Sequence, residues 1–199
     1  MDFNERSVGW WAVQVRPRYE VRVAASLRAK GYMEFLPMYR VKRQWSDRTK
    51  EIEIPLFTGY VFCRSDRTVP WAIVSSPGVI RIVGTRKEIA LINDQEIEAI
   101  QIVAASGKKV EPCDYTGIGD RVRITSGALA GVEGIVVGYK NQQRLVLSVN
   151  QIQSSISVEV DGGSTEMVSK AQKTEDVWSI PSSHLPHSHE PEHSNALSA

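Results

Sequence analysis

PLFTGYVF, residues 55–62, has the pattern of a β-strand that is apolar on both of its faces. Such a strand belongs at the centre of a sheet, so neighbouring elements can be placed around it. Thr58 and Gly59 interrupt the run, and a glycine within a strand pattern often marks a bulge or the close approach of a partner. One aromatic side chain beside the break is therefore expected to face a partner; in the alternative, all of them are core.

The residues around this strand alternate between strand and helix patterns. A predicted helix ends at Gly31, which suits a left-handed cap, and Asn93 followed by Glu96 has the spacing of a capping box. The resulting order of strands and helices predicts an α+β sandwich in which helices cover an antiparallel sheet. The flanking elements expected are strand 10–15, helix 18–30, hairpin strands 35–45 and 50–55, helix 69–75, strand 79–83 and helix 93–106.

The chain changes character at residues 107–117, GKKVEPCDYTG, where periodicity is lost and a linker is predicted. We therefore expect one domain over residues 8–106 and a small β-barrel over 118–169, because short β-rich runs separated by turn residues favour a closed sheet. Residues 1–7 and the Ser-, Pro- and His-rich tail 170–199 are expected to be disordered. The five runs are 120–124, 134–139, 144–149, 155–160 and 165–168.

The net charge of +1 conceals a division between the two halves. Residues 1–110 carry 18 Lys and Arg against 12 Asp and Glu, whereas residues 111–199 carry 6 against 11. The first half can therefore meet nucleic acid or an acidic protein, and the second should not be the main phosphate binder. No apolar run reaches the roughly 20 residues that span a bilayer, and the N-terminus lacks a secretory pattern, so we expect a cytoplasmic protein without a membrane partner.

Catalytic and metal-binding patterns are missing from the sequence. There is no nucleophile with a neighbouring base and no phosphate-binding glycine loop, so no enzyme activity and no cofactor are expected. Cys63 and Cys113 have neither disulfide nor metal spacing and are expected to be free thiols. A loose metal site in the tail is the alternative to a solvated tail without one. All four histidines lie there: His184, His187, His189 and His193.

The segment GDRVRITSGALAGVEGIVVGYK, residues 119–140, resembles the KOW motif shared by NusG-type transcription factors and some ribosomal proteins. The segments WWAVQVRPRYEVRVAASLRAKGY and PLFTGYVF resemble the N-terminal (NGN) domain of NusG, so the resemblance covers about residues 8–169. It implies an NGN-type antiparallel sheet followed by a five-stranded SH3-like KOW barrel, which we expect to be permanent. The implied function is transcription elongation or antitermination, and the nearest subtype is the set of specialised paralogues of the UpxY and RfaH groups.

The resemblance also implies two binding sites on the N-terminal domain. In the family, this domain contacts the clamp helices of the RNA polymerase largest subunit, and it contacts non-template or upstream DNA near the transcription bubble. The positions matching the polymerase site are Trp10, Trp11, Phe57 and Tyr60. The candidates for the nucleic-acid site are Arg16, Arg18, Arg22, Arg64, Arg67 and Trp71.

For the KOW barrel, the resemblance implies a second partner, either a small-subunit ribosomal protein or the Rho termination factor. Leu129 and Ile152 match the positions expected to bind it. The expected protein is a monomer that holds the polymerase clamp closed. The rival interpretation is a ribosomal or general RNA-binding KOW protein, although such proteins are usually strongly basic and the KOW half here is acidic.

Overall fold

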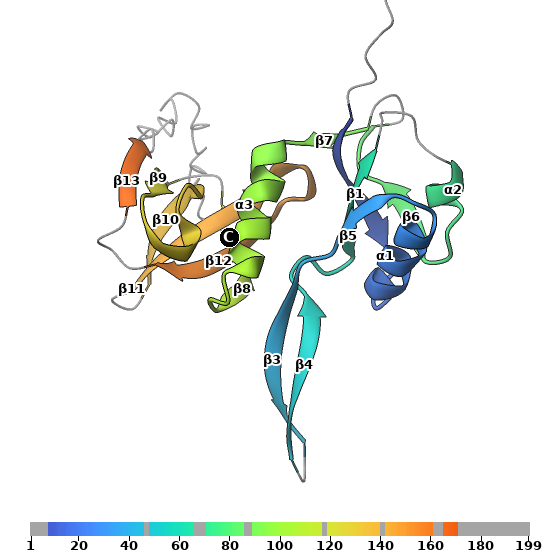
Figure 1. Ribbon diagram of the computed structural model, residues 1–199, viewed down its shortest axis with the longest axis horizontal. Helices are drawn as coiled ribbons and strands as arrows, with labels where there is room; N and C mark the ends of the chain where they lie inside the picture. The colour runs from blue at the N-terminus through green and yellow to red at the C-terminus, as the bar shows by residue number, and fades with distance from the viewer. Residues whose placement is uncertain are drawn as a thin grey trace, which may run out of the picture.

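The computed structural model describes residues 8–45, 48–65, 71–85, 89–116, 119–139, 142–160 and 165–170. It confirms the α+β class: a sheet with flanking helices is followed by a second unit built almost entirely of strands. In Figure 1, helix α3 (Asp94–Ala105) stands between the two units, and a long hairpin extends away from both. The segments predicted to be disordered lie outside the described residues, apart from Lys170.

The first sheet has the strand order β2-β5-β1-β6, with the short β7 also paired to β1. Every pair in it is antiparallel. Two of its strands, β2 and β7, are short elements that the sequence pattern did not predict. The bounds are β1 (Gly9–Val15), β2 (Met33–Phe35), β5 (Tyr60–Ser65), β6 (Val79–Ile82) and β7 (Leu91–Ile92).

The alternation of side chains along β1 divides the core of this unit into two clusters. Trp11 belongs to the cluster that packs against helices α1 (Glu20–Ala29) and α2 (Trp71–Val74). Trp10 belongs to the other cluster, which includes the buried face of α3. Both faces of β1 and β5 are therefore covered, which explains why these two apolar strands occupy the middle of the sheet.

The prediction of one continuous strand over residues 55–62 is wrong. Strand β4 (Thr49–Pro55) ends where the segment begins, the chain turns, and β5 starts only at Tyr60. The turn requires Gly59, because this residue has φ +83°, in the left-handed region that disfavours a side chain. The turn also brings Phe57 onto the same face as Phe62, and their ring centroids lie 5.3 Å apart.

Two hydrogen bonds fix this turn against the start of the chain. The backbone N–H of Val15 donates to the carbonyl of Gly59 at 2.8 Å. The backbone N–H of Gly59 donates to Oε1 of Glu20 at 2.9 Å. Glu20 is only 3% exposed, so its carboxylate joins the first turn of α1 to the β4–β5 turn inside the fold.

The predicted hairpin is confirmed as a separate two-stranded sheet of β3 (Met38–Gln44) and β4. Its register runs from Met38 opposite Pro55 to Gln44 opposite Thr49. Only the base of the hairpin contacts the first sheet in Figure 1, and the outer half extends into solvent.

The second sheet contains all five predicted strands and one more. Its order is β13-β9-β10-β11-β12-β8, and the added strand β8 comes from the predicted linker. Val110 pairs with Val158, and Pro112 is tolerated because β8 is an edge strand, where a backbone N–H can be spared. The domain limits remain a prediction. The bounds are β8 (Val110–Cys113), β9 (Asp120–Ile124), β10 (Glu133–Tyr139), β11 (Gln142–Val149), β12 (Ser154–Val160) and β13 (Thr165–Ser169).

Helix α3 begins as the sequence predicts. The Asn93 side chain accepts a hydrogen bond from the backbone N–H of Gln95 at 2.9 Å. Glu96 was expected to complete a capping box, but its carboxylate instead accepts a hydrogen bond from Asn150 in the second unit, at 2.8 Å. Glu96, whose spacing from Asn93 indicated a capping box, therefore contributes to the contact between the two units.

We predict that Glu20→Ala lowers the free energy of unfolding by about 1.5–3 kcal/mol, because the buried N–H of Gly59 would lose a charged acceptor. Glu20→Gln is the matched control, since its amide oxygen can still accept the bond and should preserve most of the stability. Urea unfolding followed by tryptophan fluorescence measures both variants, because four of the five tryptophans precede residue 72. Equal losses in the two variants would contradict this role.

Candidate interaction surfaces

The four residues predicted to contact polymerase do not share one surface. Trp10 and Phe57 are 5% and 3% exposed and lie in the cluster beneath α3. Trp11 is completely buried on the opposite face of β1, against α1. Tyr60 is half-buried and packs at the edge of the Trp10 cluster. Of the four, Tyr60 is the one that solvent reaches.

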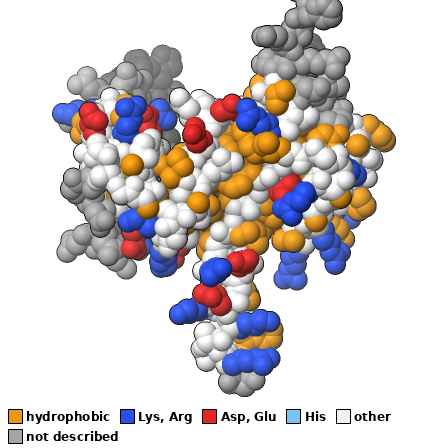
Figure 2. Space-filling view, viewed as in Figure 1, with side chains coloured by type: hydrophobic (Ala, Val, Ile, Leu, Met, Phe, Trp, Pro, Cys, Tyr) orange, Lys and Arg blue, Asp and Glu red, His pale blue; other side chains and the backbone are white. Residues whose placement is uncertain are grey.

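Two aromatic residues that sequence reasoning missed extend this accessible edge. Phe35 and Tyr39 are half-buried and, like Tyr60, pack against the Trp10 cluster. The Phe35 ring lies 6.3 Å from that of Trp10 and 6.1 Å from that of Phe62. Figure 2 shows hydrophobic side chains gathered around the base of the hairpin, next to the first sheet. The pairing of Phe35 with Phe62 across β2 and β5 is non-local, so spacing along the chain did not reveal it.

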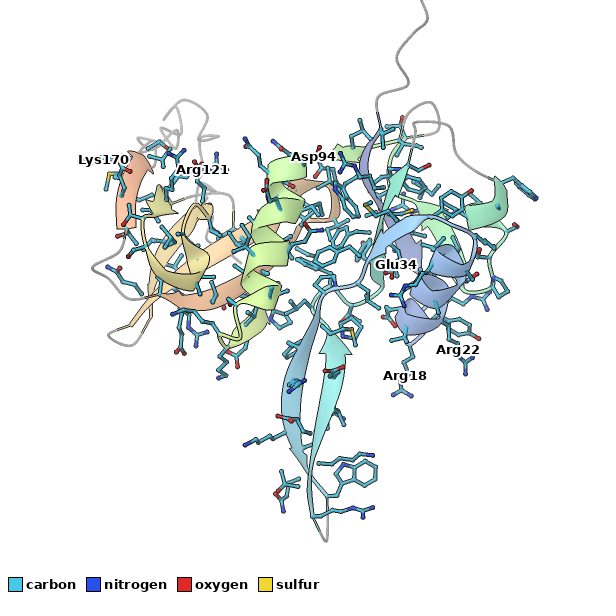
Figure 3. The ribbon with its side chains drawn as sticks, in the orientation of Figure 1. Arg18, Arg22, Glu34, Asp94, Arg121 and Lys170 are labelled. Atoms are coloured by element: carbon cyan, nitrogen blue, oxygen red, sulfur yellow. The ribbon has the colours of Figure 1, made fainter. Side chains whose placement is uncertain are left out.

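The predicted nucleic-acid residues fall into separate groups. Arg16, Arg18 and Arg22 are exposed around the start of α1, and Figure 3 shows Arg18 and Arg22 extending outward on the side of the hairpin. The Arg22 guanidinium lies 5.5 Å from the centroid of the Tyr19 ring, so the cation is held close to the helix surface.

Two of the remaining candidates, Arg64 and Trp71, lie on other elements of the first unit. Arg64, on β5, forms an ion pair with Asp94 at 3.4 Å. Trp71 is 79% exposed on α2. Arg67 lies outside the described residues. The structure therefore brings together only the three arginines near α1.

The two residues predicted to bind a partner of the second unit are buried. Leu129 and Ile152 are 2% and 8% exposed. Leu129 lies in a short 3-10 helix, η1 (Gly127–Leu129), that contacts α3. Ile152 lies in a second one, η2 (Asn150–Ile152), that contacts β7. Both positions therefore lie where the second unit meets the first.

Hydrogen bonds join the two units at this contact. Asn150 donates through Nδ2 to Glu96, while its Oδ1 accepts from the Tyr115 hydroxyl at 2.8 Å. Gln151 donates through Nε2 to the carbonyl of Leu91 at 2.8 Å. The contact thus has polar bonds at its edge and apolar residues of α3 and the second sheet within it.

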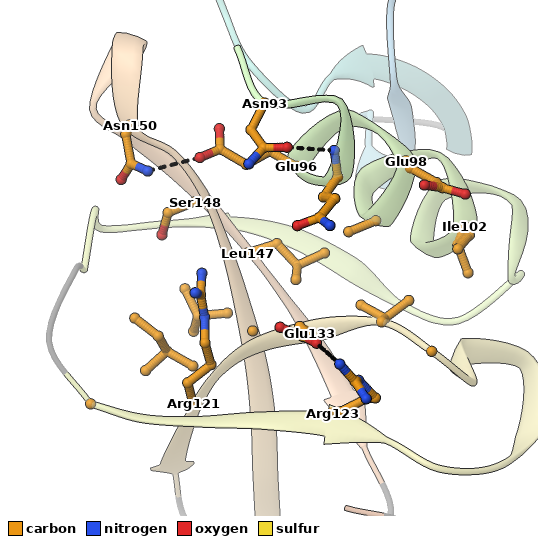
Figure 4. Close-up of a pocket in the computed structure, with 18 of the residues that line it drawn as sticks. Asn93, Glu96, Glu98, Ile102, Arg121, Arg123, Glu133, Leu147, Ser148 and Asn150 are labelled. Atoms are coloured by element: carbon orange, nitrogen blue, oxygen red, sulfur yellow. Dashed lines mark hydrogen bonds and ion pairs between the residues drawn. The ribbon is translucent and has the colours of Figure 1, made fainter. Parts of the chain in front are cut away.

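A groove of about 920 Å³ lies between α3 and strands β9, β10 and β11 (Figure 4). Its lining carries both signs of charge, with an Arg123–Glu133 ion pair on the side of the second sheet and Glu96 on the helix side. Arg121 also lines this groove. The groove offers no reactive pair of side chains, so it is best understood as the incompletely filled side of the contact between the units.

Burial raises the pKa of the Glu96 carboxyl above its ordinary value of 4.5, and the hydrogen bond from Asn150 partly opposes this shift. The second carboxylate oxygen, Oε2, is buried without a hydrogen-bond partner among the described residues. The charged form of Glu96 is therefore poorly accommodated where the two units meet.

Neither thiol lies in a reactive environment. Cys63 and Cys113 are free, as predicted. Burial raises the pKa of the Cys63 thiol to about 12 and also raises the pKa of Cys113, so both favour the less reactive protonated form. Within the described ranges, no three His, Cys, Asp or Glu side chains are grouped to hold a metal ion. Nor is any helix of those ranges both long and apolar enough for a membrane span.

We predict that Glu96→Gln raises the melting temperature at pH 7 by about 1–3 °C and that the gain shrinks toward pH 4. A carboxyl whose pKa is raised on folding stabilises the fold fully below its unfolded pKa, and this stabilisation is lost as pH rises through the folded pKa. The glutamine removes the charge and keeps an acceptor for Asn150. Glu98→Gln, at an exposed position on the same helix, should show no such pH-dependent gain in calorimetry, and equal profiles would contradict the assignment.

Comparison with known proteins places the chain in a family. The family model described as "Transcription termination factor nusG" matches residues 9–101. The "Transcription termination/antitermination protein NusG" of Lactococcus lactis is 31% identical over 168 residues, covering 77% of this chain and 89% of that protein. The protein of the same name from Streptococcus pyogenes serotype M1 is 32% identical over 169 residues, covering 77% and 92%.

A NusG protein of the same description from Pseudomonas aeruginosa is 29% identical over 174 residues, covering 80% of this chain and 98% of that protein. Each of these alignments is longer than the first unit or the second unit alone, so the similarity includes both units. The predicted resemblance is confirmed: the chain belongs to the NusG family of transcription termination and antitermination factors.

Proposed function

We propose that this protein is a non-catalytic transcription elongation and antitermination factor that binds the clamp helices of the RNA polymerase largest subunit. The observation that carries the proposal is the accessible aromatic edge at Phe35, Tyr39 and Tyr60, which rests on a buried aromatic cluster. Aromatic side chains held rigidly at a surface are effective interface anchors, and an apolar helix face is a suitable partner for them.

The buried residues of the predicted polymerase site support this edge from beneath. The Phe57 ring packs edge-on against Phe62, which in turn stacks on Phe35. Trp10 contacts Phe35 from β1. In this proposal Tyr60 touches polymerase directly, Trp10 and Phe57 position the contacting rings, and Trp11 stabilises the sheet from its other face.

The basic group near α1 is proposed to contact upstream or non-template DNA. Arg16, Arg18 and Arg22 are exposed, and a guanidinium can meet a phosphate through two hydrogen bonds at once. The excess of basic residues in this half of the chain supports the same assignment. Trp71 is an additional exposed ring that could stack on an unpaired base.

The second unit is proposed to bind a small-subunit ribosomal protein or Rho through Leu129 and Ile152. Both side chains are buried against the first unit. Their use as binding residues therefore requires the two units to separate, at the expense of the Asn150–Glu96 and Gln151–Leu91 hydrogen bonds. A partner that binds only the separated state would shift the equilibrium toward it.

The proposed mechanism is mechanical and needs no reaction at the protein. A cytoplasmic monomer bound to the clamp stabilises the closed polymerase only if it prefers that state to the open one, and the preference disfavours pausing. The rival function, binding of ribosomal RNA, predicts a different partner for the N-terminal unit, so one binding experiment separates the two.

We predict that Tyr60→Ala weakens binding of the full chain to RNA polymerase and to an isolated clamp-helix fragment by about 10-fold or more, the scale of an interface anchor. Phe57→Ala is a poor test, because emptying a buried ring site would itself cost about 3–5 kcal/mol of stability. Val168→Ala, at an exposed position in the second unit, is the control and should bind as the unaltered protein does.

Pull-down and titration with structured ribosomal RNA as competitor complete this test. Binding to the clamp fragment that survives the RNA supports the polymerase assignment. Retained binding by Tyr60→Ala would contradict the assignment of this surface to polymerase. Tight RNA binding without polymerase binding would contradict the proposed function and support the rival one.

A further inference from the structure

The outer half of the β3–β4 hairpin is a second candidate binding element, beyond Tyr39 at its base, which belongs to the proposed polymerase edge. It forms its own sheet and projects from the rest of the fold (Figure 1). Seven residues per strand at about 3.3 Å each place its end roughly 20 Å from the base. Described residues 42–45 and 48–51 are all exposed, so the outer half has no intramolecular role that burial would explain.

One face of this ribbon neutralises its own charge. Arg40 donates to the Glu53 carboxylate at 3.2 Å. Lys42 lies directly opposite Glu51 in the register. Closer to the tip, the Thr49 hydroxyl donates to Gln44 at 2.6 Å. Each cation on this face therefore has a carboxylate directly opposite it across the strands.

The opposite face ends in two cations that face one another. Arg43 pairs with Lys50 in the register, so the two side chains leave the ribbon on the same side. No ion pair is found for either residue within the described part of the chain. Like charges directly opposite in an antiparallel pair destabilise it, so this arrangement favours an external anion between or beside them.

An exposed tryptophan continues the same face. The backbone N–H of Trp45 donates to the carbonyl of Arg48 at 2.8 Å, which extends the register by one pair beyond Gln44 and Thr49. Trp45 therefore follows Arg43 on the cationic face, and it is 58% exposed. Figure 2 shows hydrophobic atoms set among Lys and Arg side chains at the hairpin end. The sequence of residues 42–50 carries four basic residues against one acidic residue, Asp47.

We propose that this tip face binds single-stranded nucleic acid, with Trp45 stacked on an unpaired base and Arg43 and Lys50 on the adjoining phosphates. A flat indole beside cations on a projecting ribbon provides the two interactions that dominate single-strand binding. An acidic protein surface would use the cations but would leave the indole face without a specific role. This contact involves the tip of the hairpin, whereas the polymerase edge uses Tyr39 at its base, and it does not depend on the proposed polymerase binding.

The test is fluorescence anisotropy with the full chain and a labelled 12-nucleotide mixed-sequence DNA strand at low salt. Trp45→Ala should weaken binding by about 5- to 100-fold, the range for loss of one stacked base, whereas Trp45→Phe should preserve most of the affinity. Arg43→Gln combined with Lys50→Gln should weaken binding at least 10-fold. It should also reduce the slope of log K against log salt by about 1.4, because two phosphate contacts are lost.

The matched control removes the same charge from the self-neutralised face. Arg40→Gln combined with Lys42→Gln should change affinity by less than about threefold, because Arg40 is paired with Glu53 and Lys42 lies directly opposite Glu51. Melting temperatures of all variants show whether the fold is intact; the Arg43 and Lys50 changes should not lower it, since they relieve repulsion.

Several results would overturn the proposal. Equal losses from the two double variants would mean that binding reflects only net charge. Absence of binding by the unaltered chain, or full affinity in Trp45→Ala, would remove the stacking contact. Equal affinity for a duplex of the same sequence would show that the tip binds the phosphate backbone without selecting single strands. Full competition by polyglutamate would show that it binds anions in general.

Discussion

The fold of the first unit depends on the contact between Glu20 and the turn at Gly59. A buried carboxylate at the start of α1 accepts the Gly59 N–H, while the end of β1 bonds to the carbonyl of the same residue. One glycine thus ties together a helix, the central strand and the entry to β5. Because the turn sends Phe57 back onto the face of Phe62, the contact also sets the aromatic cluster that supports the proposed polymerase edge.

Helix α3 gives the two units a common boundary. One of its faces packs in the Trp10 cluster, and Glu96 meets Asn150 of the second unit. The buried charge of Glu96 weakens this contact at neutral pH, whereas the apolar residues around Leu129 favour it. Leu129 and Ile152, the two proposed binding positions, are covered in this contact. Burial of apolar area favours the contact, whereas burial of the Glu96 charge opposes it. Separation of the units is therefore easier than the apolar area alone would indicate.

The sequence predicts the elements whose signals are local. Asn93 marks the start of α3, Gly31 follows α1, and the glycine-spaced runs give five strands of the second sheet. Features that depend on distant residues escaped prediction. Strand β8 forms only because β12 offers it an edge, and Glu96 finds its partner 54 residues away. For the site, aromatic spacing identified Tyr60 but could not show that Trp10 and Trp11 face opposite sides of a doubly covered strand.

If this NusG-family protein acts on transcribing polymerase through its N-terminal unit, as proposed, it should change the lifetime of a transcriptional pause. Halted elongation complexes are restarted on a template with a defined pause site, with and without the full chain, and the lifetime of the paused transcript is measured. This proposed role predicts a shorter pause with the unaltered protein and an unchanged pause with Tyr60→Ala. A pause lifetime that does not respond to saturating protein, although the protein is folded and binds RNA, would contradict it.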